Sequence, residues 1–212
     1  ESAIMSINSN EVIKDVEEKR KELKLDFILN DLNSLLKESL EGADRVKFIV
    51  ENLKGFARPG DDTPVYADIN KCIGSALNLI WNELKYKADV KTEYGDIPLT
   101  ICNPQNMNQV FMNILVNAAH AIEKYGEIMI KTWHKEDSIF ISIADTGCGI
   151  SEEHLKRIFD PFFSTKEVGA GTGLGLSISY DIVKKHNGNI TVQSENGKGA
   201  TFIVRIPVQG KS

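Results

Sequence analysis

The first part of the chain carries apolar residues at a helical period. Residues 11 to 58 are rich in Glu, Lys, Arg and Leu. From Leu25 onward, two series of positions recur every seven residues: Leu25, Leu32, Ser39, Val46 and Leu53, and Ile28, Leu35, Gly42, Ile49 and Phe56. This pattern predicts a long helical segment that packs against partner helices, although Ser39 and Gly42 weaken it midway. The alternative is a helix that packs only on its own domain.

The run from Arg58 to Pro64 ends this pattern with two prolines and a glycine. We therefore predict a helical segment over residues 1–60 and a second domain over residues 61–212. The pattern beyond the boundary predicts a strand at 65–69, a helix at 70–84, extended segments at 90–94 and 99–102, and a further helix from Pro104 with Asn103 as its cap.

Strict alternation of apolar and polar residues follows in two segments, 127–134 and 138–145, and predicts an antiparallel hairpin. A short helix at 151–158, a glycine-rich stretch, a helix at 174–187 and strands at 189–194 and 200–207 complete the chain. Hairpins with helices between them predict an α/β fold, a two-layer sandwich whose mixed sheet is covered on one face.

Composition narrows the function classes. The 212 residues carry 25 Lys and Arg against 30 Asp and Glu, a formal net charge of -5. This balance argues against binding to nucleic acid, which needs an excess of cations. Cys72, Cys102 and Cys148 are too widely spaced for a zinc motif or a disulfide framework, which suits a reducing cytosol. Apolar runs are too short for a membrane helix, so we expect a soluble chain. The sequence begins with Glu1 and not with Met, so we expect a fragment of a longer protein.

The helix from Pro104 separates its residues into two faces with different chemistry. One face is apolar, and the other carries a stripe of amides with a basic end: Asn106, Gln109, Asn113, Asn117, His120 and Lys124. Asn is unfavourable inside a helix, so two of them four residues apart need a structural partner or a ligand. Amide oxygens suit Mg²⁺ where phosphates supply the negative charge. A buried Asn bonded to backbone is the alternative.

Glycine-rich segments occur at three later points. Asp145 precedes Gly147 and Gly149. Its carboxylate can accept a hydrogen bond from the amino group of adenine, and the two glycines, which lack a Cβ, let a flat base approach the backbone. An ordinary Asp-x-Gly turn is the alternative there. The run 169–176 leads into a helix, and its backbone amides can hold phosphates, with a flexible linker as the alternative. The third segment places Thr201 just after a tight turn at 197–199.

Taken in this order, the segments resemble the N, G1, F, G2 and G3 boxes of the GHKL ATP-binding superfamily, and specifically the catalytic domain of bacterial sensor histidine kinases. The boxes look like residues 113–122, 145–149, 159–163, 171–175 and 197–201. The resemblance covers roughly residues 65–207 and implies the GHKL (Bergerat) sandwich. Residues 41–58 look like the second helix of the dimerisation and phosphotransfer domain of the same family.

The resemblance implies a role for each matching residue. Asp145 would bond the adenine amino group, with Gly149 and Thr201 near the base. Asn117 would hold Mg²⁺, with Asn113 close by, and the catalytic set would be Asn113, Asn117 and His120. A lid over residues 159–172 would offer Lys166 to the phosphates. The implied nucleotide-binding set is Asn113, Asn117, His120, Asp145, Gly147, Gly149, Ile150, Phe159, Lys166, Gly171, Thr172, Gly173, Leu174, Gly175, Leu176 and Thr201.

Two departures from related patterns refine this expectation. In hydrolytic relatives such as DNA gyrase, the position four before the magnesium-binding Asn is a Glu that activates water. Here it is Asn113, an amide without useful basicity, which favours transfer to a protein over hydrolysis. The kinases also need an acceptor His followed by an acidic residue, and none of the four histidines (His120, His134, His154, His186) is followed by one. The acceptor is therefore expected outside this chain.

The implied function is the catalytic region of a two-component sensor histidine kinase that transfers the γ-phosphate of Mg²⁺-ATP to that outside histidine. The expected partners are ATP or ADP, the acceptor helix of the parent kinase, a response-regulator receiver domain and a second copy in a homodimer. The alternative is a kinase-like anti-sigma or regulatory module that phosphorylates Ser or only senses ATP and ADP. The expected location is the cytoplasm, with any membrane anchor of the parent protein left open.

Overall fold

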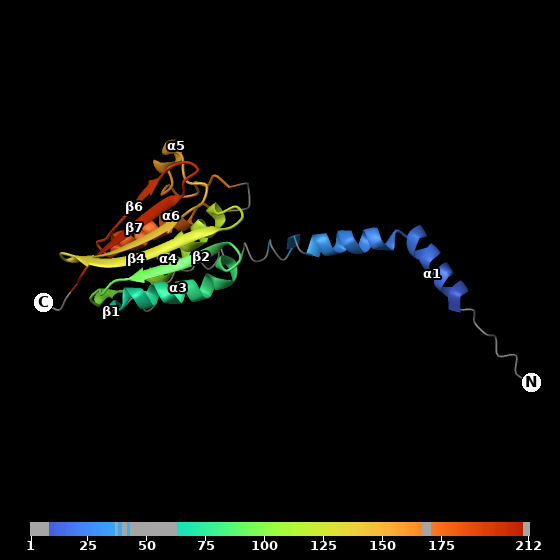
Figure 1. Cartoon of the computed structure of the whole chain (residues 1–212), viewed down its shortest axis with the longest axis horizontal. Coiled ribbons are helices and arrows are strands. Elements are labelled where there is room, and N and C mark those ends of the chain that lie inside the picture. Colours follow the sequence, from blue (N-terminus) through green and yellow to red (C-terminus); the bar gives the residue numbers. More distant parts are fainter. Residues whose placement is uncertain (1–8, 37, 40–41, 43–62, 167–170, 210–212) are drawn as a thin grey trace, which may run out of the picture. The chain divides into compact units, whose positions relative to one another are not determined.

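A computed structural model of the chain describes residues 9–36, 38–39, 42, 63–166 and 171–209. The chain divides into two compact units, Glu1–Lys54 and Gly55–Ser212, which are described in turn (Figure 1). This division lies near the boundary that the sequence suggests, and the domain limits 1–60 and 61–212 stay a prediction. Among the helices of the described ranges, none is both long enough and apolar enough to cross a membrane.

The helical unit begins with α1 (Ser9–Glu22) and continues as a helix over residues 25–36. A turn at Leu23 and Lys24 separates the two, and Lys24 adopts a left-handed backbone with φ 50°. The Arg20 Nε donates to the Asp26 carboxylate across this turn at 2.9 Å. The described part of the predicted helical segment is therefore helical on both sides of a turn that neither glycine nor proline marks. The seven-residue positions from Val46 to Phe56 lie outside the described residues.

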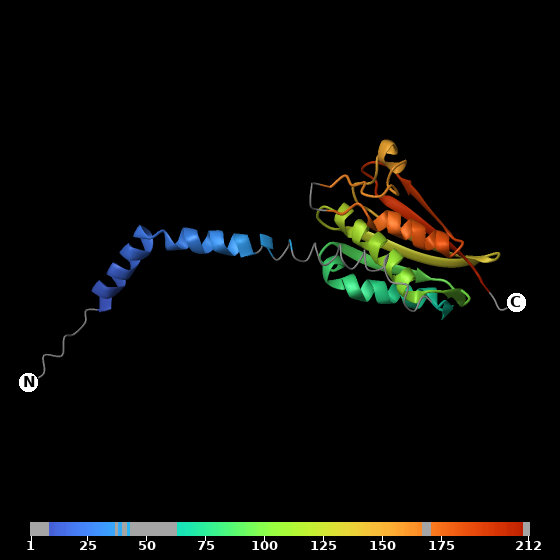
Figure 2. The same ribbon diagram turned by 180° about the vertical axis from the view of Figure 1, so that it is seen from behind.

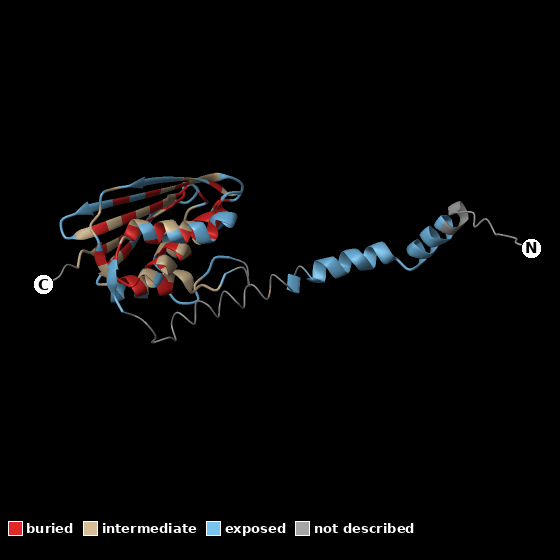
Figure 3. Cartoon of the chain, turned by 90° about the horizontal axis from the view of Figure 1, so that it is seen from below, coloured by how far each residue is buried: buried red, intermediate tan, exposed pale blue. Residues whose placement is uncertain are grey.

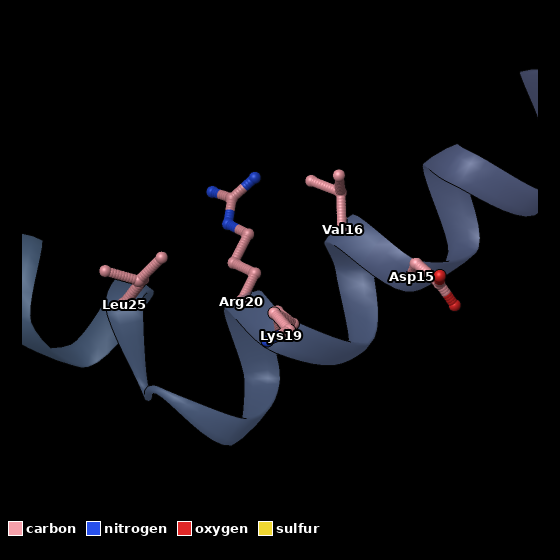
Figure 4. A pocket seen from close by; sticks show the side chains of 5 residues that line it. All are labelled: Asp15, Val16, Lys19, Arg20 and Leu25. Carbon is pink, nitrogen blue, oxygen red and sulfur yellow. The ribbon is translucent and has the colours of Figure 1, made fainter.

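Apolar side chains of the helical unit are exposed at the positions of the seven-residue pattern. Leu25, Ile28, Leu32 and Leu35 are between 39% and 54% accessible. A pocket on this unit is lined by Asp15, Val16, Lys19, Arg20 and Leu25 (Figure 4), and none of these belongs to the predicted nucleotide set. An exposed apolar stripe supports the expectation of partner helices, which stays a prediction.

The second unit is built on a mixed sheet. In its described part, β2 (Ala88–Tyr94), β4 (Gly126–Lys135), β5 (Ser138–Asp145), β7 (Ala200–Pro207) and β6 (Asn189–Ser194) lie side by side in the order β2-β4-β5-β7-β6. The β2–β4 pair is parallel and the other neighbours are antiparallel. A small antiparallel pair joins β1 (Val65–Ala67) to β3 (Thr100–Cys102). The predicted hairpin of residues 127–145 is confirmed as β4 and β5.

Helices cover one face of this sheet (Figures 2 and 3). They are α3 (Ile69–Leu84), α4 (Pro104–Ala121) and α6 (Gly175–Lys185), and α4 contacts both of the others. A short helix, α5 (Glu152–Leu155), follows the hairpin. Isoleucines at alternate positions of β4 and β5, from Ile128 to Ile143, are buried against the helices. The other face carries Trp133 stacked on Phe140, with ring centroids 5.3 Å apart. The two-layer α/β sandwich is therefore confirmed.

Candidate nucleotide-binding site

Helix α4 is fixed in rotation by its cap and its apolar face. The Asn103 side chain accepts hydrogen bonds from Gln105 N at 2.9 Å and Asn106 N at 3.1 Å, with Pro104 in the first turn, as the sequence predicts. The core-facing residues of α4 are fully or almost fully buried, among them Met107, Val110, Phe111 and Ile114. Burial of this face sets the direction in which the amide stripe points.

Two amides of that stripe, one turn apart, have different environments. Asn113 is only 4% exposed, and its Nδ2 donates to the Gly175 carbonyl at 2.9 Å and lies 3.2 Å from the Ser179 hydroxyl. Asn117 is half-buried, and within the described part of the chain its side chain makes no hydrogen bond. Asn113 thus joins α4 to the start of α6, whereas the Asn117 amide is available to a ligand.

The carboxylate of Asp145 ends strand β5 on the helix-covered face. It is 8% exposed, and its Oδ1 accepts from Gly147 N at 2.8 Å and from Ala200 N at 3.4 Å. Burial raises the pKa of this carboxyl, and the two backbone donors act in the opposite direction. Within the described residues its second oxygen makes no hydrogen bond, so an acceptor remains for a group such as the adenine amino proton.

The loop after Asp145 is pinned to the end of α4. Cys148 N donates to the Ala121 carbonyl at 2.9 Å, and a Cβ on Gly147 would lie 2.6 Å from the same oxygen. Ala121 follows Asn117 by one helical turn. The carboxylate of β5 and the free amide of α4 are therefore brought to one region of the molecule by this contact.

The same loop packs closely on the turn between β6 and β7. Gly149 has φ 70°, and a Cβ there would lie 2.2 Å from the Glu195 carbonyl oxygen. Gly197 N donates to the Cys148 carbonyl at 2.7 Å, and Ile150 N donates to the Ser194 hydroxyl at 2.8 Å. Two glycine segments far apart in the sequence thus pack together as one wall beside Asp145.

Thr201 does not lie on this wall. It pairs with Ala144 and Gln193, and burial along β7 alternates so that Ala200 and Phe202 are buried while Thr201 is not. Side chains of successive strand residues point to opposite faces, so Thr201 belongs to the open face and Ala200 to the face of Asp145. The side chain of Thr201 therefore lies on the face opposite Asp145, and its role around the base stays a prediction. Counting alternate positions back from the buried Phe202 would have found Ala200.

Two basic side chains meet at the last turn of α4. The Lys166 Nζ lies 2.7 Å from the His120 Nδ1, so that a neutral imidazole accepts from the ammonium. Partial burial, with smaller effects of Lys166 and Lys87, lowers the pKa of His120, and burial lowers the pKa of Lys166. Lys87, which the sequence analysis missed, donates to the Ile122 and Glu123 carbonyls at 3.1 and 2.9 Å. Basic groups held together in this way suit an anion.

The segment before α6 surrounds this region. Leu174 stands at the helix N-terminus without a side-chain cap, and its N–H donates to the Thr172 hydroxyl at 3.3 Å. Gly173 has φ 66° and packs on the backbone of Phe162. The rings of Phe159 and Tyr180 are in contact, with centroids 5.4 Å apart. Gly171 lies next to the Lys166 side chain, and Leu174 and Leu176 pack against the hydrophobic core. Residues 167–170 of the predicted lid lie outside the described part.

Comparisons with known proteins agree on one family. The family described as histidine kinase-, DNA gyrase B-, and HSP90-like ATPase matches residues 102–210. The chain is 38% identical over 173 residues to the signal transduction histidine-protein kinase AtoS of Escherichia coli (strain K12), covering 80% of this chain and 28% of AtoS. It is 44% identical over 115 residues to sporulation kinase E of Bacillus subtilis (strain 168), covering 54% of this chain and 15% of that kinase.

Among solved structures, the catalytic domain of the histidine kinase ThkA, in a nucleotide-free form, superposes with a TM-score of 0.62 at 30% identity. This match covers 68% of the chain and 95% of the ThkA domain. The chain therefore spans nearly all of one solved catalytic domain, but less than a third of the two curated relatives.

Proposed function

Since this chain belongs to the family of histidine kinase-, DNA gyrase B- and HSP90-like ATPases and contains the ATP-binding catalytic domain of a sensor histidine kinase, we propose that it binds Mg²⁺-ATP between α4 and the Asp145 loop and transfers the γ-phosphate to a histidine of the parent protein. The observation that carries the proposal is the hydrogen bond from Cys148 N to the Ala121 carbonyl, which joins the Asp145 loop to the turn after Asn117. In this proposal one ATP molecule extends from the Asp145 loop to Asn117.

The adenine end of the proposed site is made by β5 and its loop. Asp145 keeps a carboxylate oxygen for the base, while its other oxygen is held by Gly147 N and Ala200 N. The missing Cβ of Gly149 lets the loop pack on the β6–β7 turn, because a Cβ there would lie 2.2 Å from the Glu195 carbonyl oxygen, and this packing holds the loop beside the proposed position of the base. Recognition by a buried acceptor favours adenine, because a base with a carbonyl in place of the amino group would leave two acceptors facing each other.

The phosphate end is made by α4 and the residues before α6. The Asn117 amide oxygen fits the preference of Mg²⁺ for oxygen ligands beside phosphates, and the absence of a protein hydrogen bond to it in the described ranges agrees with that role. Bound Mg²⁺ would neutralise phosphate charge. Lys166 and His120 would bind phosphate oxygens, with His120 acting as a neutral donor because its pKa is lowered. The amides at the start of α6 add further donors.

Transfer to histidine needs orientation and charge neutralisation more than acid or base chemistry. A histidine nitrogen attacks without a base to activate it, and this site places Asn113, not a carboxylate, one turn before Asn117. The Asn113 Nδ2 is moreover bonded to the Gly175 carbonyl of α6. These features support phosphoryl transfer over hydrolysis. We propose a receiver-domain aspartate as the next acceptor and a homodimer as the parent assembly, with the exposed stripe of the helical unit as its contact.

The test is transfer of labelled phosphate in trans. The chain is incubated with Mg²⁺-ATP and a separate peptide carrying the acceptor helix of a related kinase, and acid-labile label on the histidine of that peptide is expected. The chain alone is expected to take up no stable label, since no histidine in it is followed by an acidic residue. An Asp145→Ala variant is the matched control and should lose both nucleotide binding and transfer.

Two outcomes would contradict the proposal. Acid-stable label on serine would support the regulatory alternative, a module that phosphorylates Ser. Calorimetry with ATP and ADP that detects no binding, with or without Mg²⁺, would remove the nucleotide site itself.

A further inference from the structure

The Asn113 amide has a bonding pattern that metal binding does not explain. Its Nδ2 donates to the Gly175 carbonyl at 2.9 Å and lies 3.2 Å from the Ser179 hydroxyl, and the side chain is 4% exposed. The Ser179 hydroxyl itself donates to the Gly175 carbonyl at 2.8 Å. Three groups on two helices thus share one small polar cluster, Asn113, Gly175 and Ser179, inside the packed helix layer.

Within this cluster the chemistry requires a donor at position 113. The Gly175 carbonyl is an acceptor, and the single proton of the Ser179 hydroxyl is already directed at it. An amide nitrogen supplies two protons and can serve both oxygens. An ionised carboxylate supplies none, so a Glu or Asp at this position would face the carbonyl with a buried, unpaired charge.

The cluster lies directly beneath the start of α6. That helix begins at Gly175 and has no side-chain cap, so the N–H groups of its first turn remain open to a phosphate. The Gly175 carbonyl belongs to the first residue of the helix, and Asn113 holds it from the opposite side. Asn113 also lies one turn from Asn117, so its hydrogen bonds tie the part of α4 that carries Asn117 to the first turn of α6.

We propose that Asn113 and Ser179 are positioning residues that hold the N-terminus of α6 at the correct distance from Asn117 for the phosphates. Asn113 then neither binds the metal nor acts as a base. The inference rests on the nucleotide site proposed above, and it revises the role that the family resemblance implies for Asn113. It also assigns a function to Ser179, which no sequence motif singles out.

The first test is Asn113→Asp, which keeps the shape and removes the donor. We expect Mg²⁺-ATP affinity at neutral pH to fall by about tenfold, because a buried charge is left facing an acceptor. Burial beside two oxygens favours the protonated carboxyl, which can donate one hydrogen bond. The ratio of variant to wild-type affinity should therefore recover at mildly acidic pH. A role in folding alone would not give a pH-dependent recovery of affinity among folded molecules.

Two further variants keep the test decisive. Ser179→Ala removes one partner of Asn113 without adding charge and should weaken affinity by about threefold even if the first variant fails to fold. Asn106→Asp places the same negative charge on α4 two turns earlier and should leave affinity within about twofold of wild type. Calorimetry supplies affinities, and urea unfolding confirms that each variant is folded.

The outcomes separate this inference from the proposed function. No binding by the wild-type chain removes the nucleotide site. Normal wild-type binding with an unchanged Ser179→Ala affinity overturns the positioning role. A folded Asn113→Asp variant that binds as wild type at neutral pH, or whose loss of affinity does not depend on pH, also overturns it.

Discussion

At the residue scale, the two asparagines of α4 show how neighbouring side chains of one type take different roles. The Asn113 side chain donates a hydrogen bond to α6, whereas the Asn117 side chain makes no hydrogen bond within the described residues. The repeat of four residues places both on one face, which the sequence could indicate. It could not indicate that Gly175 and Ser179, more than sixty residues later, approach only the first of them. Contacts between elements distant in sequence decided the roles.

Asn117→Ala is expected to weaken ATP binding only in the presence of Mg²⁺. The amide oxygen of Asn117 is the proposed metal ligand, whereas the proposed adenine contacts come from Asp145 and its loop. Loss of one such ligand should lower Mg²⁺-ATP affinity by roughly tenfold or more and leave Mg²⁺-free binding close to wild type. Calorimetric titration with and without Mg²⁺ measures both values. An equal loss under the two conditions would refute the metal assignment.

Nucleotide affinity should also fall on acidification because of Asp145. Burial raises the pKa of this carboxyl, so it becomes protonated at a higher pH than an ordinary Asp. The protonated form no longer offers a carboxylate to the base, and affinity is lost as pH falls through this raised pKa. Stability moves the other way, since the buried charge that disfavours the native state is removed on protonation.

The matched control is Asp145→Asn, which has no proton to gain at this position. Its affinity for ATP should be low, and the part of the pH dependence due to Asp145 should be missing from its profile. Titration of His120 remains in both proteins and cancels in the comparison. An identical pH profile for the variant and the wild type would mean that Asp145 does not contact the base.

At the scale of elements, alternation along strands and turn chemistry predicted the sheet well. The β4–β5 hairpin and the cap of α4 follow from local signals, apolar alternation and an Asn-Pro pair. The same alternation, with Ala200 and Phe202 buried, assigns the Thr201 side chain to the open face of the sheet. The break at Lys24 could not be predicted from the local sequence, because neither glycine nor proline occurs there and a lysine rarely adopts a left-handed backbone conformation.

The contact between β5 and the β6–β7 turn is expected to depend on Gly199. Its φ is 87°, and a Cβ there would lie 1.9 Å from the Asp145 carbonyl oxygen. Gly199→Ala should therefore lower the free energy of unfolding by roughly 2 to 5 kcal/mol, from backbone strain and from the collision with the strand end. Gly197 provides the control, because its φ is 81° and nothing lies within 4 Å of its Cβ position. Gly197→Ala should cost only about 1 to 2 kcal/mol.

Urea unfolding followed by tryptophan fluorescence measures both glycine variants. The chain has 2 tryptophans, Trp81 and Trp133, and both belong to the second unit. The signal therefore reports the unit that carries the site. Equal losses for the two variants would show that the β6–β7 turn does not press on the end of β5.

At the scale of the whole molecule, the fold class and the family could be predicted, whereas the geometry of the site could not. Five motifs in a fixed order identify the catalytic domain even though each alone is weak. Their relative placement depends on packing, such as the fit of Gly147 against Ala121, that no spacing in the sequence reveals. The chain covers 28% of AtoS, so the comparison informs the catalytic domain and not the remainder of that kinase.

The bond between Cys148 and Ala121 has one more implication, for the entropy of ligand binding. Because a single helical turn carries Asn117 and contacts the glycine loop, the proposed purine contacts and the proposed metal ligand would be held at a fixed spacing before ATP binds. Little chain freedom is lost there on association. Discrimination among adenine nucleotides would then depend on the proposed phosphate contacts of Lys166 and His120.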